Sequence, residues 1–135
     1  MCRPQRRERG AAVVDFVLVT AVVVPLVLGV MQVGLVLHVR NTLTAAASEG
    51  ARWAATADHG PVDGAARTRA VVSEVLSDRY AQQVSASQTS VGGAPGIVVS
   101  VRAEVPALGL LGPSVSLSVE GHAVEEPPLA AAAGP

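Results

Sequence analysis

The sequence is poor in the residues on which disulfide-bonded and many catalytic proteins depend. It has one cysteine, Cys2, which excludes an internal disulfide and a cysteine-based metal cluster. Only 2% of its 135 residues are aromatic, and all ten basic residues are arginine. Half of the residues are hydrophobic, chiefly alanine and valine, which bury little area per residue. We therefore expect one modest domain rather than a large enzyme core.

Charged side chains are absent from a long internal stretch and unevenly divided on its two sides. No Asp, Glu, Arg or Lys occurs from Phe16 to Val39. Residues 1–10 hold four arginines and one glutamate, a net charge of +3, whereas residues 41–135 hold five arginines and nine acids, a net charge of -4. About 20 apolar residues suffice to cross a bilayer as a helix, and excess arginine marks the cytoplasmic side. The pattern predicts a single-pass protein of the cell membrane.

The predicted organisation follows from this layout. Residues 1–10 form a basic cytoplasmic leader, residues 11–39 a transmembrane helix, residues 40–125 an extracytoplasmic α+β module and residues 126–135 a disordered tail. A cleaved secretory signal, with release after Ala47, is the alternative. Its apolar core would have about 7–15 residues, and the stretch here is roughly twice that length.

Two residues within the stretch do not suit a plain anchor. Pro25 removes one backbone hydrogen bond in mid-span and permits a kink. Asp15 lies just inside the apolar edge, where a carboxylate is costly unless it finds a partner or reaches headgroup water. The spacing leaves these two alternatives for Asp15 open.

A short basic leader ends at Gly10, and an acid, Asp15, stands fifth in the chain that begins at Ala11. These residues resemble the processing site of type IV pilins and pseudopilins. The aromatic Phe16 beside that acid is similar to the variant of the tight-adherence (Flp) pilus system. The resemblance implies cleavage after Gly10 by a prepilin peptidase, although the fifth-position acid is commonly Glu in such proteins.

A second block carries the resemblance beyond the apolar stretch. The sequence Arg40-Asn41, followed by Ser48-Glu49-Gly50-Ala51-Arg52-Trp53-Ala54, is similar to the TadE-like family of minor pseudopilins. The match extends over about residues 9–56. It implies a pilin-like subunit that assembles with other pilin or pseudopilin subunits and the pilus machinery, and that is incorporated in a surface filament.

Processing at Gly10 would create a pair of opposite charges. It would remove the leader and leave a new ammonium group at Ala11, four residues before Asp15. Residues i and i+4 share one side of a helix, so the two charges can meet within one chain. They can equally pair between two chains, and in a medium of low dielectric constant they attract strongly. Only a processed chain has the partner charge, so the pair would set the register of assembly.

The helix is expected to continue beyond the membrane to residue 57. Small residues recur on one side of it and allow close approach of another element. They would pack either in an assembled helix bundle or onto the protein's own module. The residues assigned to this packing are Ala47, Gly50, Ala51 and Ala54.

The rest of the chain predicts a second helix and a short antiparallel sheet. Asp63 is expected to cap a helix over residues 65–82, with an apolar face formed by Val72, Val75, Leu76 and Tyr80. Period-two alternation predicts strands over 97–105 and 115–123, and a weaker strand over 84–91 closed by residues 92–96. The apolar loop 106–113 would either touch the membrane or a partner, or cover the end of the core.

We find no pattern that points to catalysis, a cofactor or a metal site. His38, His59 and His122 lack metal-ligand spacing, and Asp58 and Asp63 are too few for calcium. The net charge of -1 argues against nucleic-acid binding. The sequence therefore predicts a minor pseudopilin, a non-enzymatic substrate of a prepilin peptidase. The alternative is an uncleaved, signal-anchored envelope protein whose outer module binds a partner.

Overall fold

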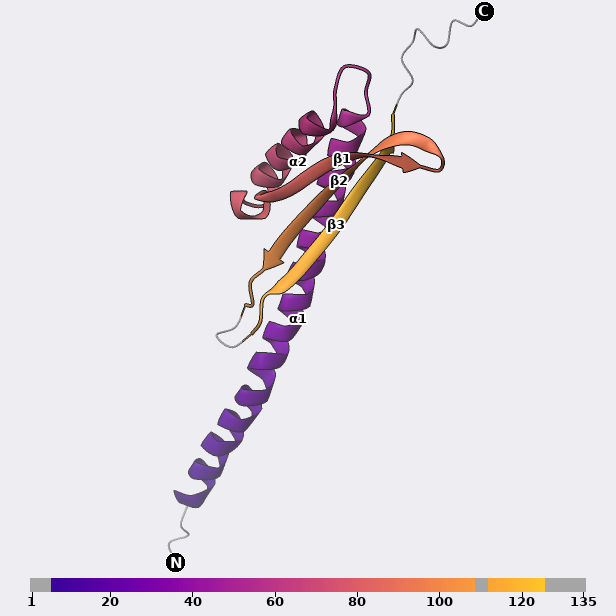
Figure 1. The fold of residues 1–135 in the computed structure, drawn as a ribbon. Helices are drawn as coiled ribbons and strands as arrows, with labels where there is room; N and C mark the ends of the chain where they lie inside the picture. The colour runs from indigo at the N-terminus through magenta and orange to yellow at the C-terminus, as the bar shows by residue number, and fades with distance from the viewer. Residues whose placement is uncertain (1–5, 109–111, 126–135) are drawn as a thin grey trace, which may run out of the picture.

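A computed structural model describes residues 6–108 and 112–125. Two helices, α1 (Arg6–Ala54) and α2 (Pro61–Val75), precede a short 3-10 helix, η1 (Asp78–Tyr80). Three strands follow, β1 (Gln83–Val91), β2 (Ala94–Val105) and β3 (Val115–Val124). These elements confirm the α+β class predicted from the sequence: a long N-terminal helix, a second helix and an antiparallel sheet (Figure 1).

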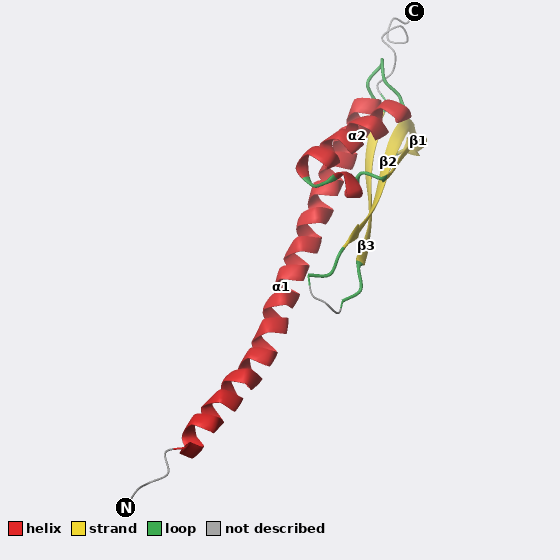
Figure 2. Cartoon of the chain, turned by 90° about the vertical axis from the view of Figure 1, so that its left-hand side faces the viewer, coloured by secondary structure: helices red, strands yellow, loops and turns green. Residues whose placement is uncertain are grey.

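The helix α1 has two halves with different surroundings. It has 49 residues and runs unbroken through Pro25, so at about 1.5 Å per residue it is long for a domain of this size. Its N-terminal half stands clear of the other elements, and its C-terminal half lies along the sheet and α2 (Figures 1 and 2). Buried residues begin at Val39 and recur every three or four positions through Leu43, Ala47 and Ala51.

The predicted end of this helix at residue 57 is wrong, because α1 stops at Ala54. The Thr56 hydroxyl donates a hydrogen bond to the Trp53 carbonyl at 2.8 Å, and the His59 N–H bonds the Thr56 carbonyl at 3.1 Å. A threonine hydroxyl that competes for backbone groups in this way favours a turn over another helical residue.

The predicted span of the second helix, 65–82, is wrong at both ends. The helix begins at Pro61, a favoured residue at the first helical position. Asp63 does cap it, but from inside, because its Oδ2 accepts the Gly60 N–H at 2.9 Å. The helix ends at Val75, which is 57% exposed rather than part of the apolar face. The chain then turns through η1, which buries Tyr80.

The three strands form an antiparallel sheet in the order β1-β2-β3. The predicted alternation along β2 is confirmed, because one face is buried and consists of Ile97, Val99, Val101, Ala103 and Val105. Both helices pack on this face, α1 along β2 and β3 and α2 against β1. The opposite face carries no element of the described chain, as Figure 2 shows.

The turn between β1 and β2 is tighter than the predicted loop over 92–96. Only Gly92 and Gly93 lie between the strands, with φ angles of +60° and +85°. Two consecutive residues with positive φ match the twist of an antiparallel pair, and glycine adopts them without steric cost. Pro95 is paired opposite Ser90 near the start of β2, where its missing N–H is tolerated.

Candidate membrane and assembly surface

The N-terminal half of α1 exposes a continuous apolar surface. The structure describes one helix, over Gly10–Ala54, that is long and apolar enough to cross a membrane. A soluble protein rarely exposes so large an apolar patch, so this surface requires a lipid or protein environment. Its large exposed side chains are Val13, Val14, Phe16, Val17, Leu18, Val19, Val22, Val23, Val24, Leu26, Val27, Leu28, Val30, Met31, Val33 and Leu37.

The residues assigned to processing lie on this exposed half, near its N-terminal end. Gly10 and Ala11 are exposed, and a Cβ atom at Gly10 would meet nothing within 4 Å. The helix begins at Arg6 and continues through the Gly10–Ala11 peptide bond without a break. A protease must therefore unwind the first turns of α1 to reach this bond, and helix ends open at low cost.

Asp15 lies one helical turn after Ala11, on the same side of α1. Both residues are exposed, and Phe16 beside them is 71% exposed. The carboxylate is thus available to a group at the N-terminus of its own chain or to a group on a neighbouring chain. The surrounding side chains in the sequence, Val13, Val14 and Val17, are apolar.

The four residues assigned to helix packing are buried against the protein's own α2 and sheet. A Cβ atom added to Gly50 would overlap the Thr68 side chain and come within 2.7 Å of the Gly64 carbonyl. Gly64 in turn lies against Ala54, and a Cβ atom there would be 2.6 Å from the Ala54 Cβ. Close approach of α1 and α2 thus requires glycine on both helices. The backbone of Ala47 and Ser48 lies against Gly121 of β3, where an added Cβ atom would also have no room.

The outward side of the same segment carries charged and aromatic residues. Arg67 of α2 donates a hydrogen bond from Nε to the Glu49 Oε1 at 2.9 Å. Its guanidinium carbon lies 5.8 Å from the centroid of the Trp53 ring, and the His59 ring centroid lies 4.6 Å from that of Trp53. The motif Glu49-Gly50-Ala51-Arg52-Trp53-Ala54 therefore combines a small inner face with an outer face that joins α1 to α2.

Sequence reasoning missed Gln32, Thr68 and Gly121 as residues that position this surface. Gln32 contacts the loop after β2, more than 70 residues away in the sequence. Thr68 is fully buried, and its hydroxyl donates to the Gly64 carbonyl at 2.9 Å. In the sequence, Gln32 stands out as an amide within a charge-free run. No sequence pattern, however, identifies the loop residues that it contacts.

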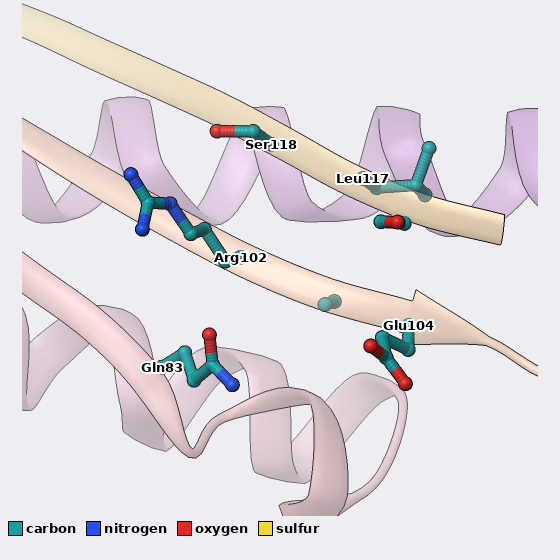
Figure 3. A pocket seen from close by; sticks show the side chains of 7 residues that line it. Gln83, Arg102, Glu104, Leu117 and Ser118 are labelled. Carbon is teal, nitrogen blue, oxygen red and sulfur yellow. The ribbon is translucent and has the colours of Figure 1, made fainter.

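The open face of the sheet carries a hollow beside Gln83, at the start of β1. Figure 3 shows Gln83, Arg102 and Glu104 around it, with Leu117 and Ser118 of β3 on its other side. These groups offer hydrogen-bond donors and acceptors to a ligand or a protein surface. Among the residues that the structure describes, no three His, Cys, Asp or Glu side chains gather as a metal site.

Comparison with known proteins gives a family match, and it lies within α1. Residues 10–52 match the family model described as TadE-like protein, which confirms the resemblance predicted from the sequence. The matched segment contains the exposed half of α1 and most of its packed half, and it excludes α2 and the sheet. It supports a protein associated with the Tad pilus system. No curated protein and no solved structure matches the chain.

Proposed function

From the TadE-like match over residues 10–52, we propose that this chain is a minor pseudopilin of the Flp, or tight-adherence, pilus system. A prepilin peptidase cleaves it between Gly10 and Ala11, and the mature chain takes part in assembly of the pilus or a related secretion filament. The observation that carries the proposal is that the family match begins at Gly10, the residue at which the basic leader ends.

The exposed half of α1 supports a role in assembly. Its apolar side chains have lipid as neighbours before assembly and the helices of other pilin or pseudopilin subunits after it. Cleavage removes the +3 leader and gives the chain an ammonium group at Ala11. Pairing of that group with Asp15 relieves the cost of holding either charge alone in an apolar environment. The chain thus acts as a protease substrate and a structural subunit, not as an enzyme.

The size of the module supports a minor role. The C-terminal half of α1, α2 and the three strands pack together, and the two helices cover one face of the sheet. A subunit with such a module is bulky beside the short major pilins that the family resemblance implies. We therefore propose a place at the tip or in priming, rather than along the shaft.

An uncleaved membrane anchor is the second candidate, and one observation favours it. The helix α1 is unbroken across the Gly10–Ala11 bond, so the chain presents no extended segment there to a protease. In that case the leader is kept, Asp15 has no ammonium partner, and the outer module alone binds an envelope component.

Co-expression with the prepilin peptidase of the same pilus system separates the two candidates. The wild-type chain should lose ten N-terminal residues, and Gly10→Val should block the loss because the side chain hinders access to the scissile bond. Gly29→Val is the matched control, since both glycines lie in α1 with nothing within 4 Å of an added Cβ atom. Cleavage of neither wild type nor control would favour the uncleaved anchor.

A further inference from the structure

The side chain of Gln32 on α1 holds the loop that follows β2 with both ends of its amide. Its Nε2 donates a hydrogen bond to the Pro106 carbonyl at 3.3 Å, and its Oε1 accepts the Leu108 N–H at 2.7 Å. These bonds fix the start of the β2–β3 loop against α1, seven residues before Val39, the first buried residue of that helix. Figure 2 shows the loop reaching α1 below the sheet.

Gln32 lies within the predicted transmembrane helix of residues 11–39, near the level at which a hydrocarbon layer of ordinary thickness would end. A hydrocarbon layer of about 30 Å takes about 20 helical residues. If the layer starts at Ala11, it ends near residue 30, and if it starts at Phe16, it ends near residue 35. Gln32 lies at or close to the outer boundary in both registers. The loop that Gln32 holds is therefore at membrane depth.

The chemistry of the loop suits that depth. No charged residue lies between Glu104 and Glu120, and Leu108 is 43% exposed. Non-helical backbone is tolerated at membrane depth only where its polar groups are satisfied by protein or water. Pro106 and Pro113 bring no N–H group, and the Leu108 N–H and Pro106 carbonyl are both bonded to Gln32.

We propose that Pro106, Ala107 and Leu108 form a second membrane contact, which rests on lipid at the outer boundary beside α1. Gln32 sets its depth by satisfying the two backbone groups. One helix alone can rotate about its axis and tilt in a bilayer, whereas two adjoining contacts restrict both motions. The module is thereby held in one orientation over the membrane before assembly. The proposal requires that α1 spans the membrane, and it does not depend on cleavage at Gly10.

Quenching of a fluorescent probe by spin-labelled lipid tests this contact. The full chain with Cys2→Ser carries a nitrobenzoxadiazole label at Leu108→Cys or, as control, at Ser90→Cys. Ser90 is exposed and pairs with Pro95, at the end of β2 farthest from the loop. In phosphatidylcholine vesicles with a nitroxide near the headgroup, we expect several-fold stronger quenching at position 108 than at position 90. Equal, weak quenching at both positions would overturn the proposal.

A second variant tests the role of Gln32. Gln32→Leu replaces the amide by an apolar side chain of similar size and removes both hydrogen bonds to the loop. We expect the probe at position 108 to lose much of its quenching, whereas Gln88→Leu, an exposed amide on β1, should leave it unchanged. Unchanged quenching in Gln32→Leu would contradict depth-setting by this residue. Because the experiment uses the uncleaved chain, failure of pilin-type processing would not alter either outcome.

Discussion

Asp15 is an acidic side chain within the apolar, exposed half of α1. If it pairs with the ammonium group of a processed chain, Asp15→Asn should leave cleavage largely intact and impair assembly. Close charge pairs in apolar surroundings couple by about 1.5 kcal/mol or more, so we expect at least about a tenfold loss of incorporation. The measurement is the fraction of cleaved protein that co-sediments with sheared filaments.

Asp15→Glu is the matched control for this variant, because it keeps the negative charge and introduces the acid that is common at this position in pilin-like proteins. It should retain most of the incorporation. Wild-type incorporation of Asp15→Asn would remove the charge-pair mechanism, whatever its cleavage.

A second prediction at the residue scale concerns Gly50, because α1 and α2 lie too close together there to leave room for a Cβ atom. Gly50→Ala would drive a methyl group into Thr68 and toward the Gly64 carbonyl. Overpacking of this kind costs about 1–3 kcal/mol, which should lower the melting temperature of the module by several degrees. Gly34→Ala on the same helix meets nothing within 4 Å and should leave it unchanged. Equal melting temperatures for both variants in detergent would contradict the packing.

At the scale of elements, the β1–β2 hairpin depends on two residues with positive φ angles, Gly92 and Gly93. Gly93 has a φ of +85°, and a β-branched residue there is strained. Gly93→Val should therefore destabilise the module by about 1–2 kcal/mol. Gly92→Asn should be nearly neutral, because asparagine is favoured at the first position of such turns. Chemical denaturation followed by Trp53 fluorescence measures both, and equal effects would argue against the turn.

The elements that depend on periodicity were predictable from the sequence, and those that depend on distant partners were not. The burial of Ile97, Val99 and Val101 followed from alternation, because a strand places every second side chain on one face. The end of α1 at Ala54 depends on the Thr56 hydroxyl. The bonds of Gln32 to the β2–β3 loop join segments that become neighbours only when the sheet packs on α1.

The candidate site divides in the same way. A local pattern singled out the small residues of α1, because their spacing carries the information. The same kind of pattern assigned roles to Gly10 and Asp15, and these roles stay predictions. The requirement for glycine at both Gly50 and Gly64 is visible only in the structure, where α1 and α2 cross at these two residues. Sequence reasoning left open whether the small residues pack in a bundle or on the module, and the structure shows them against α2 and β3.

At the scale of the whole molecule, the apolar half of α1 and the packed module lie at opposite ends (Figure 1). The arginine-rich leader predicts that the N-terminus stays in the cytoplasm and the module lies outside. A membrane-impermeant maleimide applied to spheroplasts should label Ser90→Cys in a Cys2→Ser chain. It should leave Cys2 of the uncleaved Gly10→Val chain unlabelled until the membrane is permeabilised. The reverse pattern would invert the orientation.

The N-terminal residue of the protein in its native membrane tests the central claim most directly. If a prepilin peptidase removes the leader at Gly10, as proposed, intact mass and N-terminal sequencing of the membrane fraction should give a chain that starts at Ala11. A chain that starts at Met1 or Cys2 would contradict prepilin-type processing and leave an uncleaved anchor.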